Sequence, residues 1–298
     1  MYITKYFGLL TNPTELDFVD INLKSDTQAF IDPWLIKDVS NDFCNECAEQ
    51  IQTYFDEVLK SIRAGDEKRA LDLLDNLHEI NWTRFGYSTR GMRGKAIASE
   101  HAGQIYYALK SSKAVKTGVL SDIEDTALLI PGVGKDKISD IVTNVCLPIL
   151  VEYTNQQAVN CAIPQHPVGK WMVWQPFTKK WCESDEFVLP IHNGIPILLV
   201  PKAVTNIELA VNGEDFYNKY MLTFEQQRHL SDPTSGLCRI LRTTGERRPP
   251  SKKELRKHIP YTSSKIVEYV NDYPELLEQY KKDLSGKKSV KKRRRKVF

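Results

Sequence analysis

The sequence predicts an α+β fold in which helices pack a small mixed sheet that includes residues 187–202. Apolar residues recur at helical spacing over residues 42–63 and again over 66–79. Two apolar segments flank Asn193-Gly194, and Asn-Gly is the preferred two-residue turn of a β-hairpin. The chain has 298 residues, of which 41% are hydrophobic, so it can bury a sizeable core. Together these observations favour helices around a limited amount of sheet.

The N-terminal part is predicted to be helical after an irregular start. Residues 1–37 alternate short apolar runs with turn residues, which is typical of short strands and loops. Helices are expected over 42–63 and 66–79, separated by Gly65, and again over 99–111.

A CxxC pair, Cys44 and Cys47, falls within the first of these helices. Such a pair can bind zinc or carry out redox chemistry. No second CxxC and no paired His completes a metal site, and Cys47 shares the helical spacing of Ile51 and Tyr54. The pattern therefore favours buried structural thiols over a metal site.

The C-terminal part is predicted to contain a hairpin, and several helices are expected after it. The hairpin strands are residues 187–191 and 195–200, and its second strand contains a continuous apolar stretch typical of burial. A helix is expected over 214–230. Another begins at Ser251, which forms a capping box with Glu254, and the last begins near Pro274.

Charge divides the chain unevenly and suggests three regions. Residues 1–238 contain 22 Lys/Arg and 31 Asp/Glu, whereas residues 239–298 contain 19 Lys/Arg and only 7 Asp/Glu. We expect a globular body over 1–245, a helical region over 246–284 and a disordered basic tail over 285–298, because Ser285 and Gly286 disfavour a helix. A basic end on an acidic body indicates a polyanionic partner, although a solubilising tail is the alternative.

Other partners and compartments are predicted from what the sequence lacks. No apolar run reaches the roughly 18–20 residues of a membrane span, so no membrane partner is expected. The first ten residues lack the pattern of a secretory signal, which predicts a cytoplasmic protein with reduced thiols. A partner protein and the oligomeric state are left open.

A glycine-rich basic segment over residues 83–95 is the first candidate site. It contains four cations, three glycines and no acidic residue. Glycine lets backbone amides approach an anion, and Arg adds bidentate contacts to phosphate. The segment predicts contact with nucleic acid, with a mobile surface loop as the alternative. Its candidate binding residues are Arg84, Arg90, Arg93 and Lys95.

Residues 121–146 are the second candidate. Ser121 and Glu124 fit a capping box of a short helix, which Pro131 and Gly132 would end. The turn Pro131-Gly132-Val133-Gly134, followed by Ile138, resembles the helix-hairpin-helix motif. The resemblance implies that backbone amides of Gly132, Val133 and Gly134 bind DNA phosphates without reading sequence. Ile138 departs from the small residue that is usual there.

The same segment also admits a β-hairpin. In that interpretation Asp140 and Glu152 lie on adjacent strands and resemble the acidic pair of PD-(D/E)xK nucleases, which implies that they hold Mg²⁺ for phosphodiester hydrolysis. Thr154 stands where that family has its Lys, so Lys202 is the candidate to supply the charge. The alternative is that Asp140 and Glu152 are surface carboxylates on a helix, which the helical spacing of Ile138 and Ile141 supports.

The chain as a whole loosely resembles uncharacterised proteins of bacterial defence islands, through residues 30–33 (FIDP), 132–140 (GVGKDKISD) and 196–202 (PILLVPK). Two main functions are therefore expected from the sequence, and a third class stays open, an enzyme on nucleotides that holds a small phosphate ligand with the glycine-rich segment. One is a Mg²⁺-dependent nuclease of a prokaryotic defence system. The other is a non-catalytic DNA- or RNA-binding protein, or a partner subunit. A strand over 136–146 would favour the nuclease, and a continuous helix would favour binding.

Overall fold

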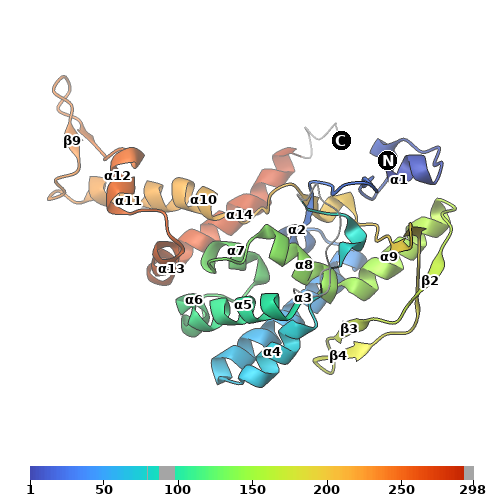
Figure 1. The fold of residues 1–298 in the computed structure, drawn as a ribbon. Coiled ribbons are helices and arrows are strands. Elements are labelled where there is room, and N and C mark those ends of the chain that lie inside the picture. The colour runs from blue at the N-terminus through green and yellow to red at the C-terminus, as the bar shows by residue number, and fades with distance from the viewer. Residues whose placement is uncertain (79, 87–97, 292–298) are drawn as a thin grey trace.

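The computed structural model describes residues 1–78, 80–86 and 98–291, and it confirms the α+β class (Figure 1). Helices dominate. Their bounds are α1 Ile3–Tyr6, α2 Pro33–Asp38, α3 Asp42–Ala64, α4 Glu67–Asp75, α5 Ala98–Ser111, α6 Lys113–Thr117, α7 Thr126–Leu129, α8 Lys135–Val145, α9 Leu147–Asn160, α10 Gly213–Phe216, α11 Leu222–Ser231, α12 Lys252–His258, α13 Ser263–Asp272 and α14 Pro274–Lys291.

The strands are short and pair as two-stranded antiparallel units rather than as one continuous sheet. The pairs are β1–β8, β2–β5, β3–β4, β6–β7 and β9–β10. Their bounds are β1 Phe30–Ile31, β2 His166–Gly169, β3 Met172–Gln175, β4 Lys180–Glu183, β5 Phe187–Leu189, β6 Ile191–His192, β7 Ile195–Pro196, β8 Thr205–Asn206, β9 Arg239–Ile240 and β10 Arg247–Arg248.

Helix α3 is the centre of the main core. It begins at Asn41, whose side chain accepts a hydrogen bond from the Cys44 amide, and it ends at Gly65 in the left-handed conformation (φ 74°). Its apolar face buries Tyr54, against which Trp174 of β3 and Trp181 of β4 pack at 5.2 and 5.6 Å between ring centroids. The β3–β4 pair therefore covers one side of α3 with aromatic rings.

Both thiols of the CxxC pair are buried on this face, as their spacing predicts. The Cys146 thiol at the end of α8 donates to the backbone carbonyl of Cys47 at 3.7 Å. Hydrogen bonding with Cys146 and burial raise the pKa of the Cys47 thiol. A raised pKa disfavours the reactive thiolate, which is consistent with a structural role for Cys47.

The hairpin at Asn193-Gly194 is confirmed, but its second strand is shorter than expected. Both turn residues have positive φ, 50° and 77°, as a type I′ turn requires. Residues 197–200 are buried but do not continue β7. The Leu198 amide donates to the carbonyl of Trp82, whereas the Leu199 amide donates to the Thr154 hydroxyl of α9. The amides of Leu198 and Leu199 therefore bond to a loop and to a helix instead of to a neighbouring strand.

The segment that allowed two interpretations is helical. A 3₁₀ turn over Ile123–Asp125 and α7 lead through the turn at residues 130–134 into α8. The β-hairpin interpretation is therefore wrong. Ile138, Ile141, Val142 and Val145 form one buried face of α8, and burial of that face outweighs strand formation. The expected capping box is also wrong, because Glu124 accepts a hydrogen bond from Lys37 instead.

A C-terminal arm, residues 213–291, extends from this body. Figure 1 shows α11, the β9–β10 hairpin and α12 at the end of the arm, away from the α3–α9 body. A π-helical turn, Tyr217–Met221, joins α10 to α11. The capping box of Ser251 and Glu254 is present at the start of α12, as predicted.

The C-terminal part of α14 differs from the disordered tail expected over residues 285–298. Helix α14 continues through Ser285 and Gly286 to Lys291, and residues 292–298 lie outside the described part of the chain. The Ser285 hydroxyl donates to the Lys281 carbonyl one turn earlier, so it is satisfied within the helix. A glycine inside a helix costs only about 1 kcal/mol, which the remaining turns can offset.

Within the described residues, no helix has both the length and the apolar character that crossing a membrane requires.

Candidate nucleic-acid interface

The glycine-rich basic segment is described only at its start. Arg84 is half-buried in the left-handed conformation (φ 53°). Burial lowers the pKa of its guanidinium, and nearby Asp26 opposes that shift. Its carbonyl accepts a hydrogen bond from the Thr27 amide at 2.7 Å. Arg84 therefore belongs to a packed loop junction. The other candidates, Arg90, Arg93 and Lys95, lie outside the described residues.

The turn between α7 and α8 is largely exposed, but the lysines next to it bond to other groups of the protein. Gly132 adopts φ 79°, and Pro131, Gly132 and Gly134 are exposed, whereas Val133 is buried. The ammonium of Lys137 donates to the Gly132 carbonyl at 3.0 Å, and Lys135 pairs with Glu208. The two lysines nearest the turn are thus engaged within the protein. DNA binding by amides 132–134 stays a prediction.

The predicted nuclease residues come from three separate elements. Asp140 is exposed on α8 and Glu152 is exposed on α9, so the adjacent strands expected for them do not exist. Lys202 donates to the Pro13 carbonyl at 2.6 Å. Burial lowers the pKa of Lys202, and Asp17 and Asp20 are the carboxylates that oppose that shift.

Among the described residues, no group of three or more His, Cys, Asp or Glu side chains is placed to hold a metal ion. Mg²⁺ therefore stays a prediction from the sequence.

The described part of the chain has a dense group of cations that sequence reasoning did not single out. It lies at the end of the arm, in the β9–β10 hairpin and α12. Residues 239–258 contain eight Lys/Arg and two Asp/Glu, a net charge of +6. We call this group the basic tip; its cations are Arg239, Arg242, Arg247, Arg248, Lys252, Lys253, Arg256 and Lys257.

Some of these cations hold the basic tip together. Arg247 donates to the backbone carbonyls of His229, Asp232 and Ser235, which fixes the loop after α11 against β10. Arg239 pairs with Glu254 and so ties β9 to α12. Hydrogen bonds from Ser251, together with Arg239, hold the pKa of Glu254 at about 2.

Other cations point outward. Leu255 is fully buried on one side of α12, while Lys253, Arg256 and Lys257 are exposed on the other, three and four residues apart. Of these three, Arg256 also donates to the side chain of Asn218 at 2.7 Å. Arg242 is exposed at the hairpin loop. In the described part of the chain, Arg242, Lys253 and Lys257 make no ion pair or hydrogen bond with another side chain. Their charges are therefore available to an external anion.

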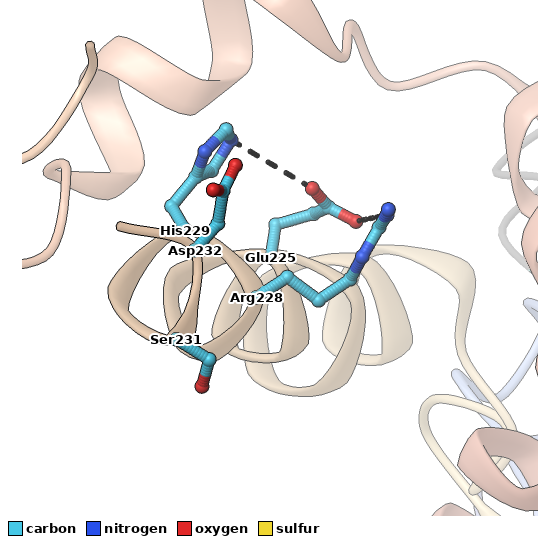
Figure 2. Close-up of a pocket in the computed structure, with 5 residues that line it drawn as sticks. All are labelled: Glu225, Arg228, His229, Ser231 and Asp232. Atoms are coloured by element: carbon cyan, nitrogen blue, oxygen red, sulfur yellow. Dashed lines mark hydrogen bonds and ion pairs between the residues drawn. The ribbon is translucent and has the colours of Figure 1, made fainter. Parts of the chain in front are cut away.

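An open pocket of about 360 Å³ lies on α11 at the base of the hairpin. Figure 2 shows its lining residues, Glu225, Arg228, His229, Ser231 and Asp232. The buried Glu225 accepts from Arg228 at 2.7 Å, and His229 Nδ1 lies 2.8 Å from the Ser235 hydroxyl. Two carboxylates oppose one guanidinium, which disfavours an anion in the pocket. These groups instead order the loop from which the hairpin rises.

The signal for the hairpin was present in the sequence. Arg242-Thr243-Thr244-Gly245 separates residues 239–241 from residues 246–248, and Gly245 adopts φ 68° in the turn. A glycine between two short segments is a hairpin indication. The many charged residues obscured the alternation, because neither strand has a continuous apolar face.

The fold and this geometry define an α+β protein with an acidic helical body and a cationic C-terminal arm. The chain belongs to the family described as "Domain of unknown function (DUF8370)", whose model matches residues 8–212. No curated protein and no solved structure matches the chain. The family match ends just before α10, so the arm and its basic tip lie beyond the matched segment.

Proposed function

We propose that the protein binds nucleic acid through the basic tip of its arm. The observation that carries the proposal is the outward face of α12, where Lys253, Arg256 and Lys257 are exposed opposite the buried Leu255. Side chains three and four residues apart on a helix lie on one face, so these cations can contact neighbouring phosphates of one backbone.

The net charges of the body and of the C-terminal region also favour binding of nucleic acid at the arm. Residues 1–212 contain 20 Lys/Arg and 27 Asp/Glu, whereas residues 213–298 contain 21 Lys/Arg and 11 Asp/Glu. A body of net charge −7 repels a polyanion, whereas residues 213–298, which comprise the arm and the last seven residues, have a net charge of +10 and attract it. A nucleic acid should therefore approach the arm first, and the association should weaken as salt screens the field.

Of the two main functions expected from the sequence, we propose non-catalytic nucleic-acid binding rather than a Mg²⁺-dependent nuclease. The reason is the continuous helix over residues 135–145, which puts Asp140 on the surface of α8 instead of on a strand next to Glu152. A place in a prokaryotic defence system and a partner protein are compatible with binding, and both rest on the sequence resemblance alone.

The test is the salt dependence of binding to short fluorescent polynucleotides, measured by anisotropy between about 50 and 200 mM salt. We expect the wild-type protein to bind more weakly as salt rises. Lys253→Gln/Lys257→Gln should lower the slope of log affinity against log salt by about 2 on duplex DNA, roughly 0.9 for each lost phosphate contact.

The matched control is Lys60→Gln/Lys68→Gln, which removes two exposed lysines from helices α3 and α4 of the body. It changes the net charge equally and should leave the slope near the wild-type value. Equal slopes for the two double variants would refute the proposed interface. Absence of binding to any polynucleotide at low salt would refute nucleic-acid binding itself.

A further inference from the structure

We propose that the β9–β10 hairpin enters the major groove of B-form duplex DNA while α12 contacts the flanking phosphates. This inference rests on the proposed function and names the class of nucleic acid. It is carried by three features of the hairpin: a fixed base, an exposed loop with groups that recognise base edges, and a width that suits one groove.

The base of the hairpin is fixed from both sides. Arg247 on β10 spans three backbone carbonyls of residues 229–235, and the Cys238 thiol donates to the His229 carbonyl at 3.1 Å. Arg239 on β9 pairs with Glu254 of α12. A hairpin held in this way loses little conformational entropy on binding, which favours affinity.

The loop itself is fully presented to solvent. Leu241 donates to the Glu246 carbonyl at 2.9 Å and Gly245 donates to the Leu241 carbonyl at 2.8 Å, which closes the loop over residues 242–245. All four loop residues are exposed, and Ile240 on β9 is 70% exposed although it is large and apolar.

The side chains of this loop are of the kinds that read base edges. Arg makes a bidentate contact with the O6 and N7 atoms of guanine, and a Thr hydroxyl can bond to several bases. An apolar side chain such as Ile240 can contact the methyl group of thymine. Arg242 and Thr243 thus provide two polar contacts, and Ile240 provides one apolar contact, within one short ribbon.

The width of a two-stranded ribbon selects the groove. Its backbones are about 4.8 Å apart before side chains are added. The major groove of B-form DNA, about 12 Å wide, admits such a ribbon, whereas the minor groove is only about 6 Å wide. The major groove of an RNA duplex is too narrow for side chains to read. The hairpin therefore fits duplex DNA and not duplex RNA.

Helix α12 is placed to support this contact. Only Pro249 and Pro250 separate β10 from its capping residue Ser251, and proline restricts the linker. The Arg239–Glu254 pair fixes the helix beside the hairpin. With the loop in the groove, we expect the exposed Lys253 and Lys257 to contact the phosphates of the DNA strand beside it.

The experiment compares binding to a DNA duplex and an RNA duplex of the same guanine-containing sequence, with dimethyl sulfate footprinting of guanine N7 on the DNA. We expect tighter binding to DNA and protection of N7, which faces the major groove. Arg242→Gln should remove the protection and weaken DNA binding about 10-fold, with little effect on RNA binding. Arg242 is exposed, so the variant should fold as the wild type does, which circular dichroism checks.

Lys253→Gln is the matched control, because it should weaken binding to both duplexes alike and leave N7 protection intact. Equal affinity for both duplexes, unprotected N7, or displacement by a minor-groove ligand would overturn the major-groove inference while the protein still bound nucleic acid. Failure to bind any polynucleotide would instead overturn the proposed function. The two failures are thus distinguishable.

Discussion

The family-matched body and the hairpin end of the C-terminal arm are stabilised in different ways. The body buries large rings, with Trp174, Trp181 and Tyr54 meeting edge to face around α3. The outer end of the arm instead relies on Arg247, which joins segments through backbone carbonyls, while exposing apolar Ile240. This difference indicates that the buried rings of the body provide stability, whereas the hairpin end of the arm provides an exposed surface.

The junction between these regions is buried and specific. Tyr280 of α14 is fully buried, accepts a hydrogen bond from the Asn212 amide at 2.9 Å and donates to the Ala210 carbonyl at 3.1 Å. Next to it, Lys281 lies 2.9 Å from a carboxylate oxygen of Asp122 and 2.6 Å from one of Asp125. The arm is therefore fastened to the body by α14 and by α13, which packs against α6 and α7, and its hairpin end lies away from the body.

The largest expected effect is the loss of a core ring from the body. Trp174 is fully buried, and its indole donates to the Thr53 hydroxyl at 3.1 Å. Trp174→Ala should lower the free energy of unfolding by about 3–5 kcal/mol, because it leaves a large cavity in the core. Urea unfolding followed by circular dichroism measures this loss. Ile240→Ala in the arm should lower the free energy of unfolding by less than about 0.5 kcal/mol. Similar losses for the Trp174 and Ile240 variants would contradict the difference between the two regions.

A smaller, pH-dependent effect is expected at the junction. Burial raises the pKa of Asp125 to about 7, although Lys281 opposes the shift. Because this value lies above the ordinary 3.8, protonation of Asp125 stabilises the folded chain. Its contribution is complete below about pH 4 and is lost as the pH rises to about 7. The free energy of unfolding should therefore fall across that range, by roughly 1–3 kcal/mol.

Asp125→Asn tests this assignment, because the amide cannot titrate. Urea unfolding at a series of pH values should give a flatter profile between pH 4 and 7 for the variant than for the wild type. Asp122 does not interfere. Burial tends to raise its pKa, but Lys281 and Lys37 lower it overall, so its contribution is lost only at more acid pH. Exposed Asp185→Asn is the control, and a profile of unchanged steepness in Asp125→Asn would place the titration elsewhere.

Local signals in the sequence predicted the elements that depend on local contacts. Gly65 ends α3, Asn193-Gly194 forms the expected turn, and Ser251 caps α12 with Glu254. In each case the residues that stabilise the element are within a few positions of one another. The α+β class followed from these elements and from the helical spacing of apolar residues.

Long-range contacts decided the features that the sequence did not predict. The β9–β10 hairpin has a local glycine turn, but its attachment to the loop after α11 depends on Arg247 reaching carbonyls 12 to 18 residues earlier, which no local pattern encodes. Residues 197–200 have the composition of a strand, but their amides bond to Trp82 and Thr154 instead of to one neighbouring strand. For the candidate site, cation clustering predicted a basic C-terminal region. It did not predict that α12 presents those cations on one face.

The smallest effect on stability is expected from removing the basic C-terminal residues 286–298. Truncation after Ser285 removes eight Lys/Arg but retains Tyr280 and Lys281 at the junction. The free energy of unfolding should change by less than about 0.5 kcal/mol, since surface changes away from buried contacts are usually of that size. The salt slope for polynucleotide binding should nevertheless become shallower, because fewer counterions are released from the phosphates. A stable truncated chain with an unchanged slope would show that this end only solubilises the protein, and would leave the basic tip as the whole interface.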